Sequence, residues 1–171
     1  MGVLFMSSYK NILVGVDGSK QSEMALEKGI ISAIQNNAKL ILLSVINGER
    51  YPNTSTVGYG FIDRSVYDTA VEEMKKKLNE FKQRAVDAGV KDVETEVKIG
   101  NAKLELGTDY PRAHDVDLIV VGATGLNVIG RMIVGSTSSY VIREAPCDVI
   151  VVKTDKDNRE VDLQKTTYPE I

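Results

Sequence analysis

The stretch from 122 to 138 contains the residue types that could hold a phosphate. Three of its glycines and three consecutive hydroxyl residues share a defined spacing: Gly122, Gly125, Gly135, Ser136, Thr137 and Ser138. Glycine lets the backbone approach a ligand closely. The N–H groups at the start of a helix favour an anion, and the helix dipole adds to this preference. Hydroxyl groups there can cap the helix or donate to phosphate oxygens. The stretch therefore predicts a phosphate cradle.

The neighbouring segments would place this cradle at the end of a strand. Residues 117–121 form a short apolar run rich in β-branched residues, which predicts a buried strand. Residues 138–144 are expected to form a helix, and Pro146 would stop it. The glycine loop would thus connect a buried strand to the start of a helix.

Two common phosphate-binding motifs do not match this loop. A Walker A loop requires Gly-Lys followed by Ser or Thr, which is missing at the needed spacing. A dinucleotide-binding fingerprint is compact and follows the first strand of the sheet. The alternative of a strand, a glycine-containing loop and a capped helix that bind no ligand stays open.

The rest of the chain alternates strands and helices. Apolar runs predict further strands at 12–16, 39–46, 93–99 and 148–152. Helices are expected from Ser19, a plausible N-cap, to Asn36, over 65–88, and from Asn101 toward His114, where Pro111 would end or kink the helix early. The alternation of 93–99 predicts a strand near a sheet edge with one exposed face. The βαβαβαβαβ order predicts one α/β domain, with a parallel sheet and helices on both faces.

Composition excludes several classes of function. The net charge of −3 gives no basic footprint for nucleic acid, and the apolar runs are too short to span a bilayer. A single cysteine, Cys147, excludes an intramolecular disulfide, and one histidine, His114, argues against a metal cluster. We expect a cytoplasmic protein with a flexible N-terminus at 1–8, one domain at 9–153 and a polar tail at 154–171.

The spacing Gly-x2-Gly-x9-Gly-Ser-Thr that begins at Gly122 resembles the ATP-binding signature of the universal stress protein (UspA) family. The segments 12–19 and 145–152 also resemble the family's first strand and its closing proline and strand. The similarity covers about 9–153. It implies an adenine nucleotide alpha hydrolase-like sheet of order 3-2-1-4-5, in which the first and fourth strands lie side by side. Because all three glycines and the Ser-Thr pair are kept, the chain resembles the ATP-binding branch of the family.

The resemblance implies roles for individual residues. The ribose and phosphates would be held by Gly122, Ala123, Gly125, Gly135, Ser136, Thr137 and Ser138. The backbone of Gly15, Val16 and Val45 would line the adenine. Asp17 would bond a ribose hydroxyl or hold a water bound to Mg²⁺, and Arg131 would reach a phosphate. Three plainer interpretations stay open: Asp17 forms only a turn, Val45 is core, and Arg131 lies on the surface.

The favoured function is a regulatory, stress-response protein that binds ATP, with at most slow hydrolysis or autophosphorylation, because the sequence offers no clear catalytic constellation. Family members resembling this chain form homodimers through the strand equivalent to Asp148–Val152. Two alternatives compete with this hypothesis. One is a dimeric interaction module without a ligand. The other is an enzyme of the adenylyl-transferring or ATP-pyrophosphatase class, which would need a Ser-Gly-Gly-x-Asp-Ser-like loop where this chain has residues 15–19.

Overall fold

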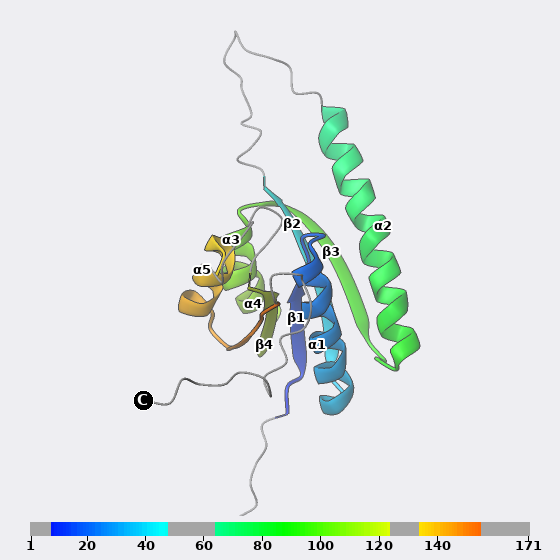
Figure 1. Ribbon diagram of the computed structural model, residues 1–171, viewed down its shortest axis with the longest axis vertical. Coiled ribbons are helices and arrows are strands. Elements are labelled where there is room, and N and C mark those ends of the chain that lie inside the picture. The colour runs from blue at the N-terminus through cyan, green and yellow to red at the C-terminus, as the bar shows by residue number, and fades with distance from the viewer. Residues whose placement is uncertain (1–7, 48–63, 124–133, 155–171) are drawn as a thin grey trace, which may run out of the picture.

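The computed structural model describes residues 8–47, 64–123 and 134–154, with the backbone alone at 64–67. One parallel sheet of order β3-β2-β1-β4-β5 forms the centre of the molecule (Figure 1). Its strands are β1 (Asn11–Gly15), β2 (Lys39–Asn47), β3 (Val93–Gly100), β4 (Leu118–Gly122) and β5 (Asp148–Val152). The expected α/β fold and its strand order are therefore confirmed.

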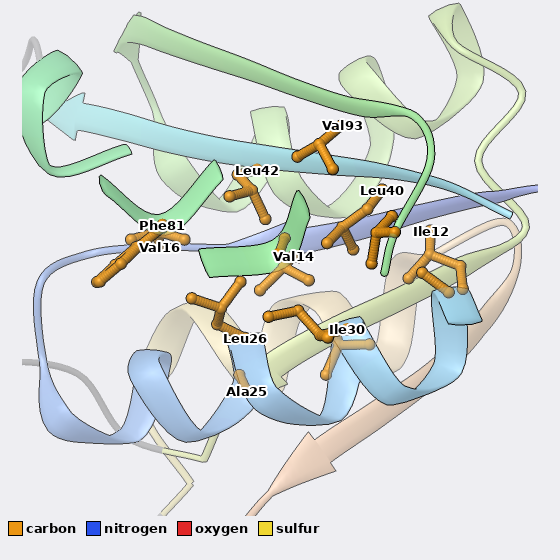
Figure 2. Close-up of a cluster of buried hydrophobic side chains, with 14 of the residues drawn as sticks. Ile12, Val14, Val16, Ala25, Leu26, Ile30, Leu40, Leu42, Phe81 and Val93 are labelled. Carbon is orange, nitrogen blue, oxygen red and sulfur yellow. The ribbon is translucent and has the colours of Figure 1, made fainter. Parts of the chain in front are cut away.

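Helices α1 (Lys20–Asn36) and α2 (Arg64–Ala88) cover one face of the sheet. The Ser19 side chain caps α1 by accepting a hydrogen bond from the backbone N–H of Ser22, as its position predicts. Asn37 ends the helix in the left-handed conformation. Figure 2 shows how Leu26 and Phe81 of these helices meet the strands in a common apolar core. This layer fixes where the first strand ends and α1 begins.

The opposite face is covered by α5 (Ser136–Glu144) and by a continuous helical segment at 102–113. That segment consists of α3 (Ala102–Leu104), the π-helical turn η2 (Glu105–Asp109) and α4 (Tyr110–Ala113). Of the two outcomes expected for Pro111, an early end or a kink, the early end is wrong, because the helix continues to Ala113. The N–H of Tyr110 bonds to the carbonyl of Glu105, five residues back. This wider turn lies directly before the proline, which has no N–H to give.

The two edges of the sheet differ in polarity. The face of β3 that points toward the helical segment is polar rather than simply exposed: Glu94 pairs with Lys39, and Glu96 accepts a hydrogen bond of 2.9 Å from the Tyr110 hydroxyl. At the other edge, Ile150 of β5 has 38% of its surface exposed. The predicted edge position of 93–99 is confirmed, but its polar face has partners on β2 and on the helical segment.

No helix among residues 8–47, 64–123 and 134–154 is long and apolar enough to cross a membrane. Residues 48–63 between β2 and α2 lie outside the described residues, as do the N-terminus before residue 8 and the tail after residue 154.

Candidate functional site

The carboxyl ends of β1 and β4 lie side by side. Val14 of β1 pairs with Val120 of β4, so Gly15 and Gly122 follow at the carboxyl ends of these neighbouring strands. The chain order reverses between these strands, since β2 and β3 lie on one side of them and β5 on the other. In open α/β sheets, ligands bind outside the carboxyl ends of the strands at such a switch point. The tertiary structure thus brings together the two strand ends singled out in the sequence.

Asp17 lies in the turn that connects β1 to α1. Its side chain is exposed, and Oδ1 accepts a hydrogen bond of 2.9 Å from the backbone N–H of Ser19. Gly18 between them has a φ of +84°, a conformation that favours glycine. The carboxylate therefore forms the turn and also projects at the switch point. This geometry is compatible with both roles considered for it.

Gly122 packs against the first turn of α1. A Cβ at this position would lie 2.8 Å from Cβ of Gln21 and 3.0 Å from its carbonyl carbon. Real Cβ atoms do not approach other atoms this closely, so any side chain would displace α1. The glycine is therefore needed for the contact between strand and helix, whatever ligand lies nearby. A bulky replacement such as valine would disturb the fold as well as a binding site.

Helix α5 begins two residues earlier than expected, and Gly135 is its N-cap. Because glycine has no side chain, the N-cap residue itself makes no side-chain cap hydrogen bond. The Ser138 hydroxyl donates a hydrogen bond of 2.7 Å to the carbonyl of Gly122, and the N–H of Gly135 bonds to the carbonyl of Ala123 at 2.7 Å. These two bonds fix the start of α5 to the end of β4. Ser138 is thus occupied within the protein, while Ser136 is exposed at the first helical position.

Residues on the neighbouring strands complete the candidate site. Val16 is buried, and its N–H bonds to the carbonyl of Leu43 on β2 at 2.9 Å. Val45, two residues farther along β2, is only partly buried. It packs against the apolar core on the sheet face that α5 and the helical segment cover. Gly125 and Arg131 lie outside the described residues. The described part of the site therefore comprises the ends of β1, β2 and β4 and the start of α5.

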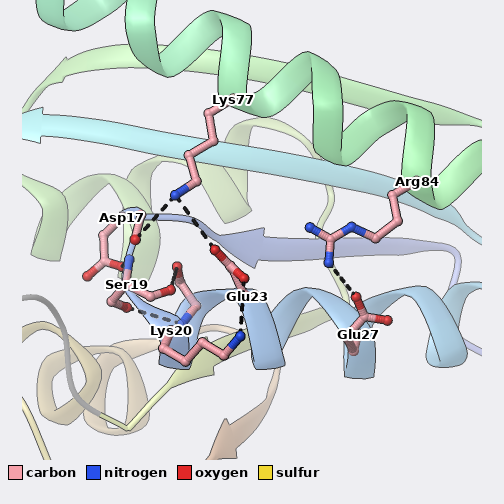
Figure 3. A network of polar contacts seen from close by, with 9 residues as sticks. Asp17, Ser19, Lys20, Glu23, Glu27, Lys77 and Arg84 are labelled. Atoms are coloured by element: carbon pink, nitrogen blue, oxygen red, sulfur yellow. Dashed lines mark hydrogen bonds and ion pairs between the residues drawn. The ribbon is translucent and has the colours of Figure 1, made fainter. Parts of the chain in front are cut away.

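The sequence analysis missed Lys77 of α2. Its Nζ donates a hydrogen bond of 3.3 Å to the carbonyl of Gly18 and lies 3.7 Å from Oε1 of Glu23 (Figure 3). The run of charges on this helix suggests a solvated face. However, Lys77 lies three residues after Met74 and four before Phe81, which places it beside the apolar stripe. That spacing was the signal for a contact with the neighbouring layer.

The structure describes both Cys147 and His114, the single cysteine and the single histidine of the chain. Burial, and next the charge of Asp117, raises the pKa of the Cys147 thiol to about 11, so it stays protonated at neutral pH. The His114 ring stacks on Tyr110 with 3.8 Å between centroids. Across residues 8–47, 64–123 and 134–154, no three His, Cys, Asp or Glu residues are grouped as metal ligands. Asp17 is an exposed carboxylate at the switch point.

Comparisons with known proteins agree with this architecture. A family model, the universal stress protein family, matches residues 8–153. The chain therefore belongs to the universal stress protein family. A universal stress protein of Staphylococcus aureus (strain USA300) is 40% identical over 151 residues, which cover 88% of each chain.

Two solved structures are similar to the whole fold. Universal stress protein UspA from Lactobacillus plantarum matches with a TM-score of 0.74 and 33% identity, covering 85% of this chain and 98% of that one. A universal stress protein in complex with cAMP matches with a TM-score of 0.64 and 27% identity, covering 86% and 98%. The resemblance found in the sequence is thus confirmed at the level of family and fold.

Proposed function

We propose that this chain is an ATP-binding regulatory protein whose nucleotide lies at the switch point between β1 and β4. The observation that carries the proposal is the bond between Ser138 and Gly122, which holds the start of α5, with glycine as its N-cap, against the end of β4. Backbone N–H groups at a helix start favour phosphate. A structural neighbour of 27% identity that is in complex with cAMP supports an adenine nucleotide as the ligand class.

The donors and acceptors of the site suit the three parts of such a nucleotide. Partly buried Val45 offers an apolar surface for a base, and exposed Asp17 offers an acceptor for a ribose hydroxyl. The start of α5 offers backbone donors and the hydroxyls of Ser136 and Thr137 to phosphates. Gly125 and Arg131 complete the proposed phosphate contacts. Apolar surface, acceptor and donors lie at one edge of the sheet in the order that adenosine and its phosphates require.

Magnesium fits the site as a companion of the phosphates. Mg²⁺ keeps several waters and commonly takes only one or two carboxylates besides phosphate oxygens, and Asp17 is the carboxylate positioned for this. Bound Mg²⁺ would neutralise phosphate charge. We expect at most slow hydrolysis or autophosphorylation of the bound nucleotide.

We also propose a homodimer formed through β5. Val149 and Val151 are only partly buried, and Ile150 has 38% of its surface exposed on this edge strand. Unpaired backbone groups on an apolar edge strand favour pairing with another strand. A two-fold axis would let β5 of each copy pair with its mate and would leave the switch point outside the interface.

The function is tested by calorimetric titration of the purified protein with ATP, ADP, AMP, cAMP, GTP and FMN, with and without Mg²⁺. Mass spectrometry of denatured protein would first identify any nucleotide that copurifies. We expect preference for adenine nucleotides and tightest binding of ATP. Absence of binding to every nucleotide would favour the alternative of a ligand-free interaction module. Rapid release of pyrophosphate or AMP would favour the enzyme class.

A further inference from the structure

Lys77 connects α2 to the turn that carries Asp17. In Figure 3 its side chain extends from α2 toward the residues at the start of α1. The ammonium group donates to the Gly18 carbonyl at 3.3 Å and lies 3.7 Å from Oε1 of Glu23. The Lys77 side chain has 33% of its surface exposed. The contact therefore joins one helical layer to the edge of the candidate site.

The turn itself is one hydrogen-bonded unit. Oδ1 of Asp17 accepts from the N–H of Ser19, and Oγ of Ser19 accepts from the N–H of Ser22 at 3.1 Å. Gly18 lies between these bonds in the left-handed region with a φ of +84°. A displacement of the Gly18 carbonyl would therefore move the Asp17 carboxylate. Lys77 holds this carbonyl from outside the turn.

We propose that Lys77 is a positioning residue for the nucleotide: by holding the Gly18 carbonyl it keeps Asp17 oriented toward the ligand and couples nucleotide affinity to α2. This inference rests on the proposed function. Coupling of this kind is reciprocal, so bound nucleotide should also protect the contact between α2 and the turn. The interaction is partly exposed to water, which screens it and limits its strength.

Arg84 provides a matched control on the same helix. Its Nη1 lies 2.8 Å from Oε1 of Glu27, so it also joins α2 to α1. Both cations lie over the ring of Phe81, at 5.5 Å for Lys77 and 4.8 Å for Arg84. Only Lys77 of this pair contacts the Asp17–Ser19 turn. A loss that is common to both variants therefore reflects the packing of the two helices, and a loss confined to Lys77 reflects the turn.

The experiment compares Lys77→Met, Lys77→Arg and Arg84→Met with the parent in the full chain. Methionine keeps an unbranched apolar side chain against Phe81 but removes the charge and the donors. ATP affinity is measured by calorimetry, and amide hydrogen exchange at Ser19 reports on the turn without any nucleotide. We expect about fivefold weaker ATP binding in Lys77→Met, the lower end of typical coupling between sites. Lys77→Arg should retain affinity within about twofold, since arginine keeps the charge and the donors.

The outcomes separate this inference from the function on which it rests. Faster exchange at Ser19 and weaker ATP binding in Lys77→Met, with both near parental values in Arg84→Met, support the inference. If the parent binds ATP and Lys77→Met binds it with the same affinity as Arg84→Met, Lys77 is not a positioning residue and the proposed function stands. If the parent binds no nucleotide, the proposed function is wrong and the inference falls with it.

Discussion

Replacing Gly135 with aspartate should raise the stability of the protein and lower its affinity for ATP. Gly135 is the N-cap of α5, with φ −62° and ψ 160°, a conformation that any residue adopts at an N-cap. An aspartate there would accept a hydrogen bond from an N–H group of the first turn. It would thus place a negative charge on the groups to which we assign phosphate.

The two effects have opposite signs and estimable sizes. Aspartate gains a few tenths of a kcal/mol over glycine as an N-cap, and its charge gains about 0.3–1 kcal/mol from the helix dipole. The free energy of unfolding should therefore rise by about 0.5–1 kcal/mol. In a domain of this size, this corresponds to a Tm increase of about 1–4 °C. ATP affinity should fall at least tenfold, about 1.4 kcal/mol, because two unit charges about 4 Å apart repel by about 4 kcal/mol near a protein surface.

Calorimetric titration with Mg-ATP and thermal unfolding of the nucleotide-free protein measure both quantities. Gly135→Asn is the matched control, since it supplies a cap without the charge, and we expect it to lie between the parent and Gly135→Asp in affinity. ATP binding by Gly135→Asp within about twofold of the parent would refute the assignment of phosphate to the start of α5. If Gly135→Asp is less stable than the parent, the aspartate does not cap α5 in the expected geometry.

Four further changes test separate contacts. Gly122→Ala should lower the free energy of unfolding by about 1–3 kcal/mol in urea denaturation, since its methyl group would overlap α1; an unchanged midpoint contradicts that packing. Asp17→Asn should weaken Mg-ATP more than metal-free ADP, whereas equal losses would assign the carboxylate to the ribose or the turn. Burial, and next the bond to Glu96, raises the pKa of Tyr110, so the folded phenol keeps its proton above about pH 10, where the unfolded one loses it. From that pH upward the parent should therefore lose more stability than Tyr110→Phe, and an equal loss in both proteins would argue against this linkage. Val151→Pro should convert a dimer to a monomer in light scattering, because proline cannot donate to a paired strand; a parent that is already monomeric at micromolar concentration refutes the dimer.

The sequence alone predicted most of the elements because they depend on local patterns. Apolar runs of β-branched residues gave the five strands, and helical spacing gave α1 and α2 within a residue or two of their ends. The N-cap at Ser19 could also be predicted, since it involves a bond to Ser22, three residues farther along the chain. The strand order required more than periodicity: it followed from the family resemblance, and the sheet confirms it.

The helical segment at 102–113 shows where local rules gave the wrong answer. Proline removes one N–H and opposes a regular turn before it, so an early end was expected. The chain instead widens by one residue into η2 and continues to Ala113. Burial of Leu106 and Tyr110 against the sheet favours keeping the segment helical. A local preference was therefore outweighed by packing.

The sequence by itself determined the class of fold, because the alternation of strands and helices is encoded in local patterns along the whole chain. For residues 122–138 it supplied a hypothesis, a phosphate cradle, from residue type and spacing. Only the tertiary structure decided how particular residues are used. Gly122 touches Gln21, the Ser138 hydroxyl is taken by the Gly122 carbonyl, and Lys77 holds the turn at Gly18. Each of these contacts joins residues that are distant in the chain or lie on different elements. Their partners are set by the register of the sheet and the packing of the helices on it, which no local pattern encodes.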